Sequence, residues 1–90
     1  MESMERLLKA MANRRRIMIL AYLRREKEAS VGEIASAIRL SFRSTSRHLR
    51  ILAAADILVH EQRRLTVFYR IAGELALVVR ALLPYFRVRN

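Results

Sequence analysis

The segment FRSTSRHLR carries the side chains in this sequence best suited to contacting a polyanion. Arg43 and Arg47 lie four residues apart, so a helix would place both guanidinium groups on one face, beside the hydroxyl groups of Ser44 and Ser46. Arginine can donate two hydrogen bonds to O6 and N7 of guanine, and serine can bond base edges or phosphates. The spacing therefore favours contact with duplex DNA over an ordinary solvated helix face.

Residues next to this segment and elsewhere complete the predicted DNA-contacting set. Ser41 and the backbone N–H groups after it would form a helix N-terminus, which attracts phosphate. Phe42 would either touch a thymine methyl group or, as we favour, pack against the neighbouring helix. The full set is Ser41, Phe42, Arg43, Ser44, Ser46, Arg47, Arg50, Arg63, Arg64, Arg14 and Arg15.

The two arginine clusters outside this segment have alternative roles. Arg63 and Arg64, at a predicted hairpin tip, would enter or flank the minor groove, whose negative potential attracts arginine. They would serve equally well as charges that protect a strand edge from aggregation. Arg14, Arg15 and Arg16 lie where a helix macrodipole disfavours cations, which suggests a phosphate clamp, with a structural role for Arg16 as the alternative.

Composition and charge restrict the class of protein. Ninety residues suffice for one domain, 1–90, and a hydrophobic content of 53% excludes a disordered tail. The net charge of +10 favours a polyanionic partner. Cysteine is absent, which excludes disulfides and thiolate chemistry. The longest apolar tract has seven residues and no signal-peptide pattern is present, so we expect no membrane association and a cytoplasmic location.

The residue types do not predict an enzyme. No Ser/His/Asp set, carboxylate pair or glycine-rich phosphate loop occurs. His48 and His60 lack a third metal ligand, and His48 would more readily bond a backbone or phosphate group. We therefore predict no catalytic residue, no cofactor and no metal site.

Hydrophobic periodicity and capping residues predict four helices in the first 55 residues. Apolar residues recur at helical spacing from about 2 to 12. Asn13 would cap a second helix running to about residue 28, and a capping box of Ser30 and Glu33 would open a third. A three-residue connection then leads to helix 42–55. The last two helices form a helix-turn-helix, expected over about 31–55.

The hydrophobic period changes to two after this arrangement. Strands are predicted at about 57–61 and 66–71, with a tip at 62–65. Asp56 would tolerate the left-handed conformation that ends the preceding helix. With this wing over about 57–71, the expected fold is mainly α with a two-stranded β wing. It is a winged helix-turn-helix in the order helix-helix-helix-helix-strand-strand-helix.

The first and last helices are predicted to form a dimer. The stretch from about 73 to 83, which Pro84 would stop or kink, is apolar nearly all round, so one buried stripe cannot account for it. Pairing with a second copy would cover this surface; covering the open side of a monomeric core is the alternative. We expect dimerisation helices at about 2–12 and 73–86. The predicted interface residues are Met4, Leu7, Leu8, Met11, Leu75, Val78, Val79, Leu82 and Phe86.

The chain resembles the winged helix-turn-helix repressors of the ArsR/SmtB family in the stretches LLKAMANRRRIMILAYL, SVGEIASAIRLS, STSRHLRIL and VFYRI. These stretches cover nearly all of residues 7–71, and STSRHLRIL resembles the family's recognition helix almost residue for residue. The resemblance implies DNA binding through that helix.

Three departures from the family pattern concern metal sensing and the wing. Metal sensors of the family carry a Cys-x-Cys pair where this chain has Ser30 and Gly32. Other members use His and acidic residues of the last helix, which here offers only Glu74. The hairpin tip lacks the usual glycine and is a residue shorter. The resemblance therefore implies DNA binding without a metal response.

These features predict a sequence-specific, double-stranded DNA-binding transcription regulator. We expect a homodimeric repressor, not responsive to metal, that binds an inverted-repeat operator. Two alternatives stay open: a sequence-indifferent architectural DNA-binding protein, and a winged-helix module that binds another protein.

Overall fold

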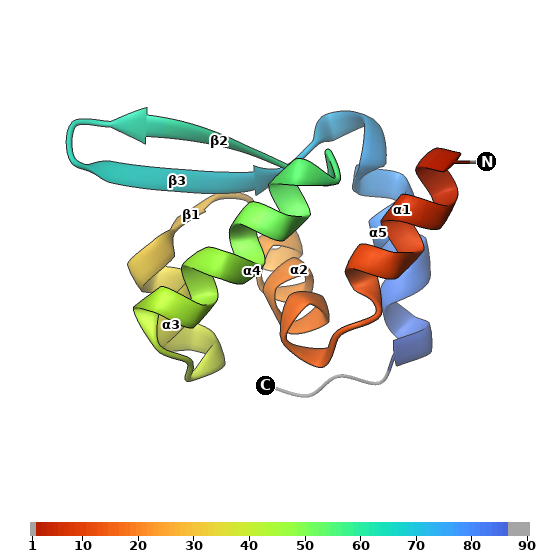
Figure 1. The fold of residues 1–90 in the computed structure, drawn as a ribbon, viewed down its shortest axis with the longest axis horizontal. Helices are drawn as coiled ribbons and strands as arrows, with labels where there is room; N and C mark the ends of the chain where they lie inside the picture. Colours follow the sequence, from red (N-terminus) through yellow and green to blue (C-terminus); the bar gives the residue numbers. More distant parts are fainter. Residues whose placement is uncertain (1, 87–90) are drawn as a thin grey trace.

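The chain folds into helices packed around α2, with a β-hairpin projecting to one side (Figure 1). The structure is a computed structural model that describes residues 2–86. The helices and the hairpin follow one another in the predicted order. The elements are α1 (Glu2–Met11), α2 (Arg14–Glu26), β1 (Ala29–Ser30), α3 (Val31–Ile38), α4 (Phe42–Ala54), β2 (Leu58–Arg63), β3 (Thr66–Ile71), the 3-10 turn η1 (Gly73–Leu75), α5 (Ala76–Leu82) and the 3-10 turn η2 (Leu83–Phe86).

Helix α2 forms the centre of the core, because α1, α3, α4, α5 and β3 all pack against it. Asn13 caps this helix as predicted, since its Oδ1 accepts a hydrogen bond from the backbone N–H of Arg16 at 3.2 Å. The helix ends at Glu26 instead of about residue 28, and Lys27 after it has a φ of 75°. The buried side chains of α2 are Ile17, Met18, Ile19, Leu20 and Leu23.

Helices α3 and α4 form the predicted helix-turn-helix. In the capping box, the N–H of Ser30 donates to Glu33 Oε1 at 2.8 Å, and the N–H of Glu33 donates to Ser30 Oγ at 3.1 Å. Arg39 ends α3 in the left-handed conformation with a φ of 57°. Ser41 caps α4 by accepting from the N–H of Ser44 at 3.1 Å. Short-range hydrogen bonds thus define the start of both helices.

The predicted hairpin is confirmed, but it belongs to a sheet with a third strand. Strand β1 pairs with β3, so the strand order is β1-β3-β2 and all pairs are antiparallel. Two residues, Arg64 and Leu65, connect β2 and β3, so the tip is shorter than the predicted 62–65. Arg64 adopts the positive φ, 58°, that a glycine would favour. Asp56 has a φ of 63°, the left-handed conformation expected there.

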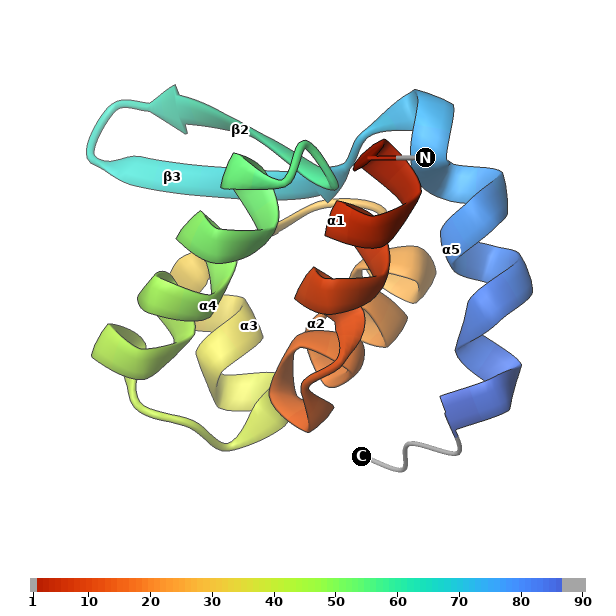
Figure 2. The same ribbon diagram turned by 45° about the vertical axis from the view of Figure 1, so that its right-hand side comes forward.

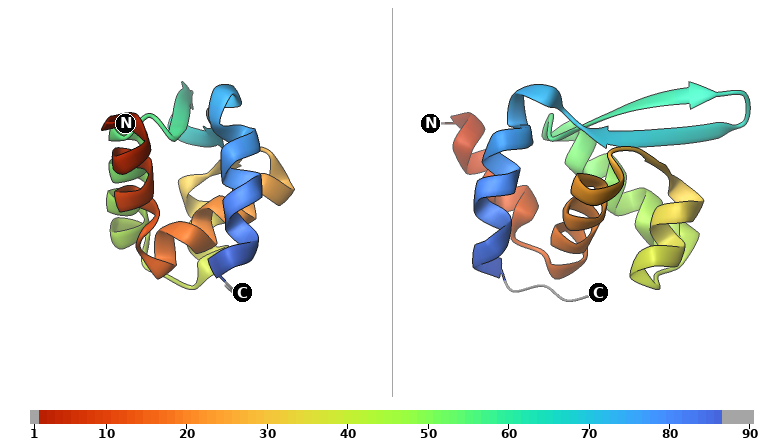
Figure 3. Two further views of the ribbon diagram at one scale, coloured as in Figure 1. Left: turned by 90° about the vertical axis from the view of Figure 1, so that its right-hand side faces the viewer. Right: turned by 180° about the vertical axis from the view of Figure 1, so that it is seen from behind.

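The C-terminal segment is less regular than predicted. The helix expected over about 73–83 is divided into η1, α5 and η2. Pro84 lies in η2 and has no backbone N–H to donate, which accounts for the end of the α-helical ladder at Leu82. Helices α1 and α5 flank α2 at the end of the molecule away from the hairpin tip (Figures 2 and 3).

Three of the nine residues predicted for the dimer interface were placed wrongly. Leu7, Met11 and Val79 are buried in the core of the protomer itself, so they offer no surface to a second copy. All three pack in the hydrophobic core of their own chain, and this burial explains why these positions are apolar. The other six keep exposed surface: Met4 and Leu8 are exposed, and Leu75, Val78, Leu82 and Phe86 are half-buried.

Candidate nucleic-acid interface

The outward face of α4 presents the two arginines with guanine-reading potential. Thr45, Leu49 and Leu52 anchor the opposite face in the core, which fixes the rotation of the helix. Arg43 and Arg47 are exposed, and among the residues that the structure describes neither guanidinium group makes a hydrogen bond or an ion pair. Both side chains are therefore free to bind an external acceptor.

The hydroxyl groups of Ser41 and Ser46 already accept hydrogen bonds within the α4 segment. Ser41 Oγ accepts the N–H of Ser44 as the helix cap. Ser46 Oγ accepts a hydrogen bond from Nη1 of Arg50 at 3.0 Å, one turn further along. The pair of Ser46 and Arg50 is exposed on the surface, so either member can exchange its partner for a phosphate or a base edge.

The prediction that Phe42 packs against the neighbouring helix is wrong. The residue is 62% exposed. It borders a groove of about 420 Å³ between the start of α4, the β1–α3 corner and the hairpin. Leu65 of the hairpin tip lines the same groove and is 97% exposed. Leu65 was not among the predicted contact residues; the signal for it is an apolar residue in the two-residue turn of an otherwise charged hairpin tip.

The arginine cluster at the start of α2 is largely structural. Nη1 of Arg15 donates to the carbonyl oxygen of Ile38 at 3.0 Å, at the end of α3. Arg16 donates from Nη1 to the carbonyl of Ala10 and from Nε to Nδ1 of His48, at 3.1 and 3.3 Å. These bonds tie α1, α3 and α4 to α2. Of the cluster, only Arg14 is exposed and makes no such bond within residues 4–86.

His48 accepts a hydrogen bond from a guanidinium group, not from the backbone or phosphate partner that we expected. It is buried on the inner face of α4. As an acceptor at Nδ1 the imidazole must be neutral, with its proton on Nε2. The pKa of His48 is lowered by burial and further by the positive charges of Arg16, Arg47 and Arg15.

We expect folding stability to fall as the pH drops below about 6.5, the ordinary pKa of histidine. Because the pKa of His48 is lower in the folded protein, the unfolded chain binds a proton first, and protonation favours unfolding. Urea unfolding at about pH 7.5 and about pH 5.5 measures the change. His48→Gln, which keeps an acceptor for Arg16, should reduce it, whereas His60→Gln is the matched control. An undiminished pH dependence in His48→Gln would contradict this assignment.

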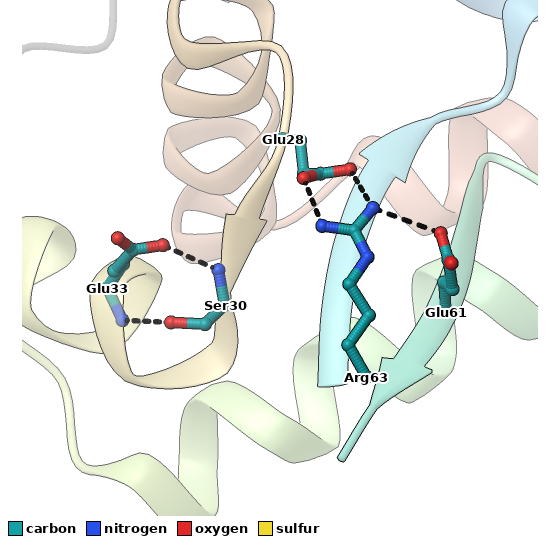
Figure 4. Close-up of polar contacts among 5 residues, drawn as sticks. All are labelled: Glu28, Ser30, Glu33, Glu61 and Arg63. Carbon is teal, nitrogen blue, oxygen red and sulfur yellow. Dashed lines mark hydrogen bonds and ion pairs between the residues drawn. The ribbon is translucent and has the colours of Figure 1, made fainter. Parts of the chain in front are cut away.

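Arg63 lies in an ion-pair cluster that joins the hairpin to the β1 side of the sheet (Figure 4). Its Nη1 and Nη2 donate to the two carboxylate oxygens of Glu28 at 2.7 and 2.8 Å, and Nη2 also donates to Glu61 at 3.0 Å. The guanidinium group lies 4.7 Å from the ring centre of Phe68. Hydrogen bonding to Arg63 lowers the pKa of Glu28, and the two carboxylates raise the pKa of Arg63.

The two arginines near the hairpin tip therefore have different roles. Arg63 is held by two carboxylates, so it positions the hairpin and its charge is compensated locally. Arg64 is exposed in the turn and carries no ion pair within the described part of the chain. The local sequence does not distinguish the two arginines, because Glu28 lies 35 residues from Arg63 in the chain.

We expect Arg64→Gln to reduce the slope of log DNA affinity against log salt concentration by roughly 0.9, the value for one lost phosphate contact. Arg63→Gln should leave this slope nearly unchanged, because it removes a cation that Glu28 and Glu61 already neutralise. Fluorescence anisotropy over a salt series measures both. A smaller slope in Arg63→Gln, with Arg64→Gln unaffected, would assign the phosphate contact to Arg63 instead.

Of the positions of the family's metal ligands considered above, only Glu74 carries a residue type that the family uses. Ser30 and Gly32 lie at the β1–α3 corner, where Ser30 serves as a helix cap, and Glu74 is exposed in η1. Within the described residues, no group of three or more His, Cys, Asp or Glu side chains is arranged to hold a metal ion. Nor does this part of the chain contain a helix long and apolar enough to cross a membrane.

A helix-turn-helix whose second helix is basic, followed by a projecting hairpin, defines the winged helix-turn-helix class of domains. Comparison with known proteins agrees: the Helix-turn-helix domain family matches residues 11–61. The transcriptional activator HlyU of Vibrio cholerae is 42% identical over 67 residues, which are 74% of this chain and 61% of that protein. The chain thus aligns with less than two thirds of this relative's length.

Solved structures of similar fold include regulators from three bacteria. HlyU from Vibrio cholerae has a TM-score of 0.84 at 35% identity, covering 94% of this chain and 92% of that one. A homodimeric winged helix-turn-helix DNA-binding domain from Mycobacterium bovis, a possible ArsR-family regulator, has a TM-score of 0.86 at 29% identity, covering 94% and 79%. The repressor PagR of Bacillus anthracis has a TM-score of 0.79 at 26% identity, covering 90% and 93%.

The chain belongs to the Helix-turn-helix domain family and, within it, to the ArsR/SmtB-type winged helix-turn-helix transcription regulators. The predicted family and fold class are confirmed. This family consists of transcription regulators with a DNA-binding domain and is not a class of enzymes.

Proposed function

We propose that this protein is a homodimeric, sequence-specific regulator that represses transcription by occluding a promoter. The observation that carries the proposal is the outward face of α4, where Arg43 and Arg47 are exposed and without internal partners beside a projecting hairpin. A net charge of +10 supports binding to a polyanion.

Each part of this surface has a distinct task in the proposed complex. Helix α4 lies in the major groove, and Arg43 and Arg47 read guanines through bidentate hydrogen bonds. Ser41 and Arg14 bind phosphates that flank the groove. Arg64 and Leu65 at the hairpin tip meet the minor groove, where arginine is attracted by the negative potential. Phe42, exposed at the start of α4, contacts thymine methyl groups.

The proposed dimer uses the apolar surface that the protomer leaves uncovered on α1 and α5. Met4 and Leu8 of α1 and Val78 and Leu82 of α5 retain exposed surface, and these helices lie at the same end of the molecule (Figure 3, left). A two-fold axis there would present the α4 helices to half-sites one DNA turn apart, about 34 Å. The operator is then an inverted repeat. The homodimeric relative from Mycobacterium bovis supports this arrangement.

Repression, rather than activation, and independence from metal are further parts of the proposal. The relatives include an activator, HlyU, and a repressor, PagR. A short domain whose surface is occupied by DNA and dimer contacts acts most simply by excluding other proteins from the promoter. The residues at the metal-ligand positions of the family, Ser30 and Gly32, are poor ligands. We place the regulator in the cytoplasm.

Fluorescence anisotropy with two labelled duplexes tests the function: the region upstream of the protein's own gene and a shuffled control, each over a salt series. A preference of about a hundredfold for the upstream duplex is expected of a specific regulator. Equal affinity for both duplexes across tiled upstream fragments would instead indicate an architectural DNA-binding protein. No binding at physiological salt would refute DNA binding and favour a protein partner.

A further inference from the structure

A second surface, away from α4, combines cations with apolar walls. It is a groove of about 560 Å³ between the C-terminal end of α2, the end of β3 and the start of α5. These three elements lie together on the face opposite α4 (Figure 3, right). Four basic side chains line the groove, together with four apolar ones: Arg24, Lys27, Arg70 and Arg80, and Leu23, Ile71, Ala76 and Leu77.

The charges in this groove are not balanced by its own lining, which contains no acidic residue. Within the described part of the chain, none of the four basic side chains makes an ion pair or a side-chain hydrogen bond. Glu28 lies near enough to Arg70 to be influenced by its charge, but its carboxylate is bonded to Arg63. The groove therefore concentrates positive potential that an anion would neutralise.

The apolar part of the groove is open to solvent. Leu77 of α5 is 75% exposed and lines the groove together with Leu23 and Ile71. A second groove, of about 420 Å³, shares Arg24 and Arg80 with the first and continues along α2 and α5 past Ile17, Ala21, Leu83 and Pro84. Arg25 also lines this second groove, so the two grooves form a track that presents both cations and apolar side chains along its length.

This surface is distinct from both interfaces proposed above. None of the residues proposed to contact DNA lines either groove, and neither does any residue predicted for the dimer. On α5 the two surfaces use different flanks: Ala76 and Arg80 lie toward the grooves, whereas Val78 and Leu82 lie on the other flank. The proposed dimer surface is apolar, whereas this groove is lined by four cations that would meet the positive net charge of a second copy, so we assign the groove an anionic occupant.

We propose that the groove binds a small amphipathic organic anion, a carboxylate on an aliphatic chain. The volume lies within the range of about 300 to 1,000 Å³ usual for small-molecule sites. The carboxylate lies among Arg24, Arg70 and Arg80, and the aliphatic chain covers Leu77 and runs toward Leu83. Charge selects the head group, and burial of methylene groups favours a long tail, by up to about fourfold in affinity for each one.

Amide shifts of the free, isotope-labelled full chain test the proposal without DNA. Decanoate, kept monomeric, should shift the signals of Leu23 to Lys27, Arg70, Ile71 and Ala76 to Arg80 and should saturate. Hexanoate should bind at least tenfold more weakly because fewer methylenes are buried. Decyltrimethylammonium, with the same tail and the opposite charge, should not saturate. Saturable binding of this cation, or shifts confined to α4 or to the other flank of α5, would overturn the proposal.

A pair of double variants tests the head-group contacts. Arg24→Gln/Arg80→Gln should weaken decanoate binding roughly tenfold, about threefold for each exposed cation removed. Arg6→Gln/Arg43→Gln lowers the net charge equally but away from both grooves, and should retain the original affinity. Equal weakening in the two double variants would indicate a non-specific effect of net charge. Binding seen only with anionic phospholipid vesicles, and not with monomeric decanoate, would indicate a membrane surface in place of a small molecule.

Discussion

Arg47→Ala is expected to lower the preference for the operator over a shuffled duplex by roughly ten- to a hundredfold, the range for losing one bidentate guanine contact. The side chain is exposed on the second helix of the helix-turn-helix and has no partner among the described residues to compensate for the contact. Non-specific affinity should fall much less, because only one of the protein's many cations is removed. Anisotropy titrations on both duplexes, at one salt concentration, measure the two effects.

Arg47→Lys separates base reading from simple charge. Lysine keeps the positive charge but lacks the planar pair of donors that matches O6 and N7 of guanine. We expect it to restore non-specific affinity while leaving most of the preference lost. Arg6→Ala, on α1 and away from the proposed DNA surface, is the control for net charge. If Arg47→Ala weakens binding to both duplexes equally, Arg47 contacts phosphate and does not read a base.

Met11→Ala is expected to lower the free energy of unfolding by about 2 to 5 kcal/mol, the range for deleting most of a fully buried methionine side chain. Met11 has no exposed surface and packs into the core beside residues of α2. The substitution removes apolar contacts and leaves a cavity that the surrounding helices fill only in part. Denaturant unfolding at several protein concentrations measures the loss.

Leu8→Ala is the matched control on the same helix. Leu8 is exposed in the protomer, so its truncation should scarcely change the intrinsic stability of the fold. If α1 contributes to the dimer, Leu8→Ala should weaken association, and its effect on unfolding should depend on protein concentration. The effect of Met11→Ala should be nearly the same at every concentration. The reverse pattern would place Met11, and not Leu8, at the interface.

The fold was predictable where short-range interactions determine it. The capping box of Ser30 and Glu33 joins residues three apart, and Ser41 caps α4 over the same distance. The change from helical to alternating periodicity predicted β3 with its observed bounds and β2 with small errors at both ends. Strand β1 has only two residues, too few to show a period, and it exists because β3 offers it an edge to pair with.

The candidate site was predictable in part for the same reason. Arg43 and Arg47 share the outward face of α4 because Thr45, Leu49 and Leu52, at helical spacing on the opposite side, form its inward face. The hydrogen-bond partner of an arginine could not be predicted in this way, because the partner can lie far away in the chain. Arg16 reaches His48 and Arg63 reaches Glu28, at sequence separations of 32 and 35 residues. No local pattern distinguishes these arginines from Arg64.

By itself, then, the sequence determined the helix-turn-helix, the hairpin and the face of α4 that meets solvent, since periodicity and capping act over three or four residues. Only the tertiary structure decided which apolar side chains are buried and which charged side chains have a partner. It placed Val79 in the core of one protomer and left Leu77 exposed beside cations from α2 and β3. The physical reason is that burial and charge pairing depend on which elements pack together, and those elements are distant in the chain.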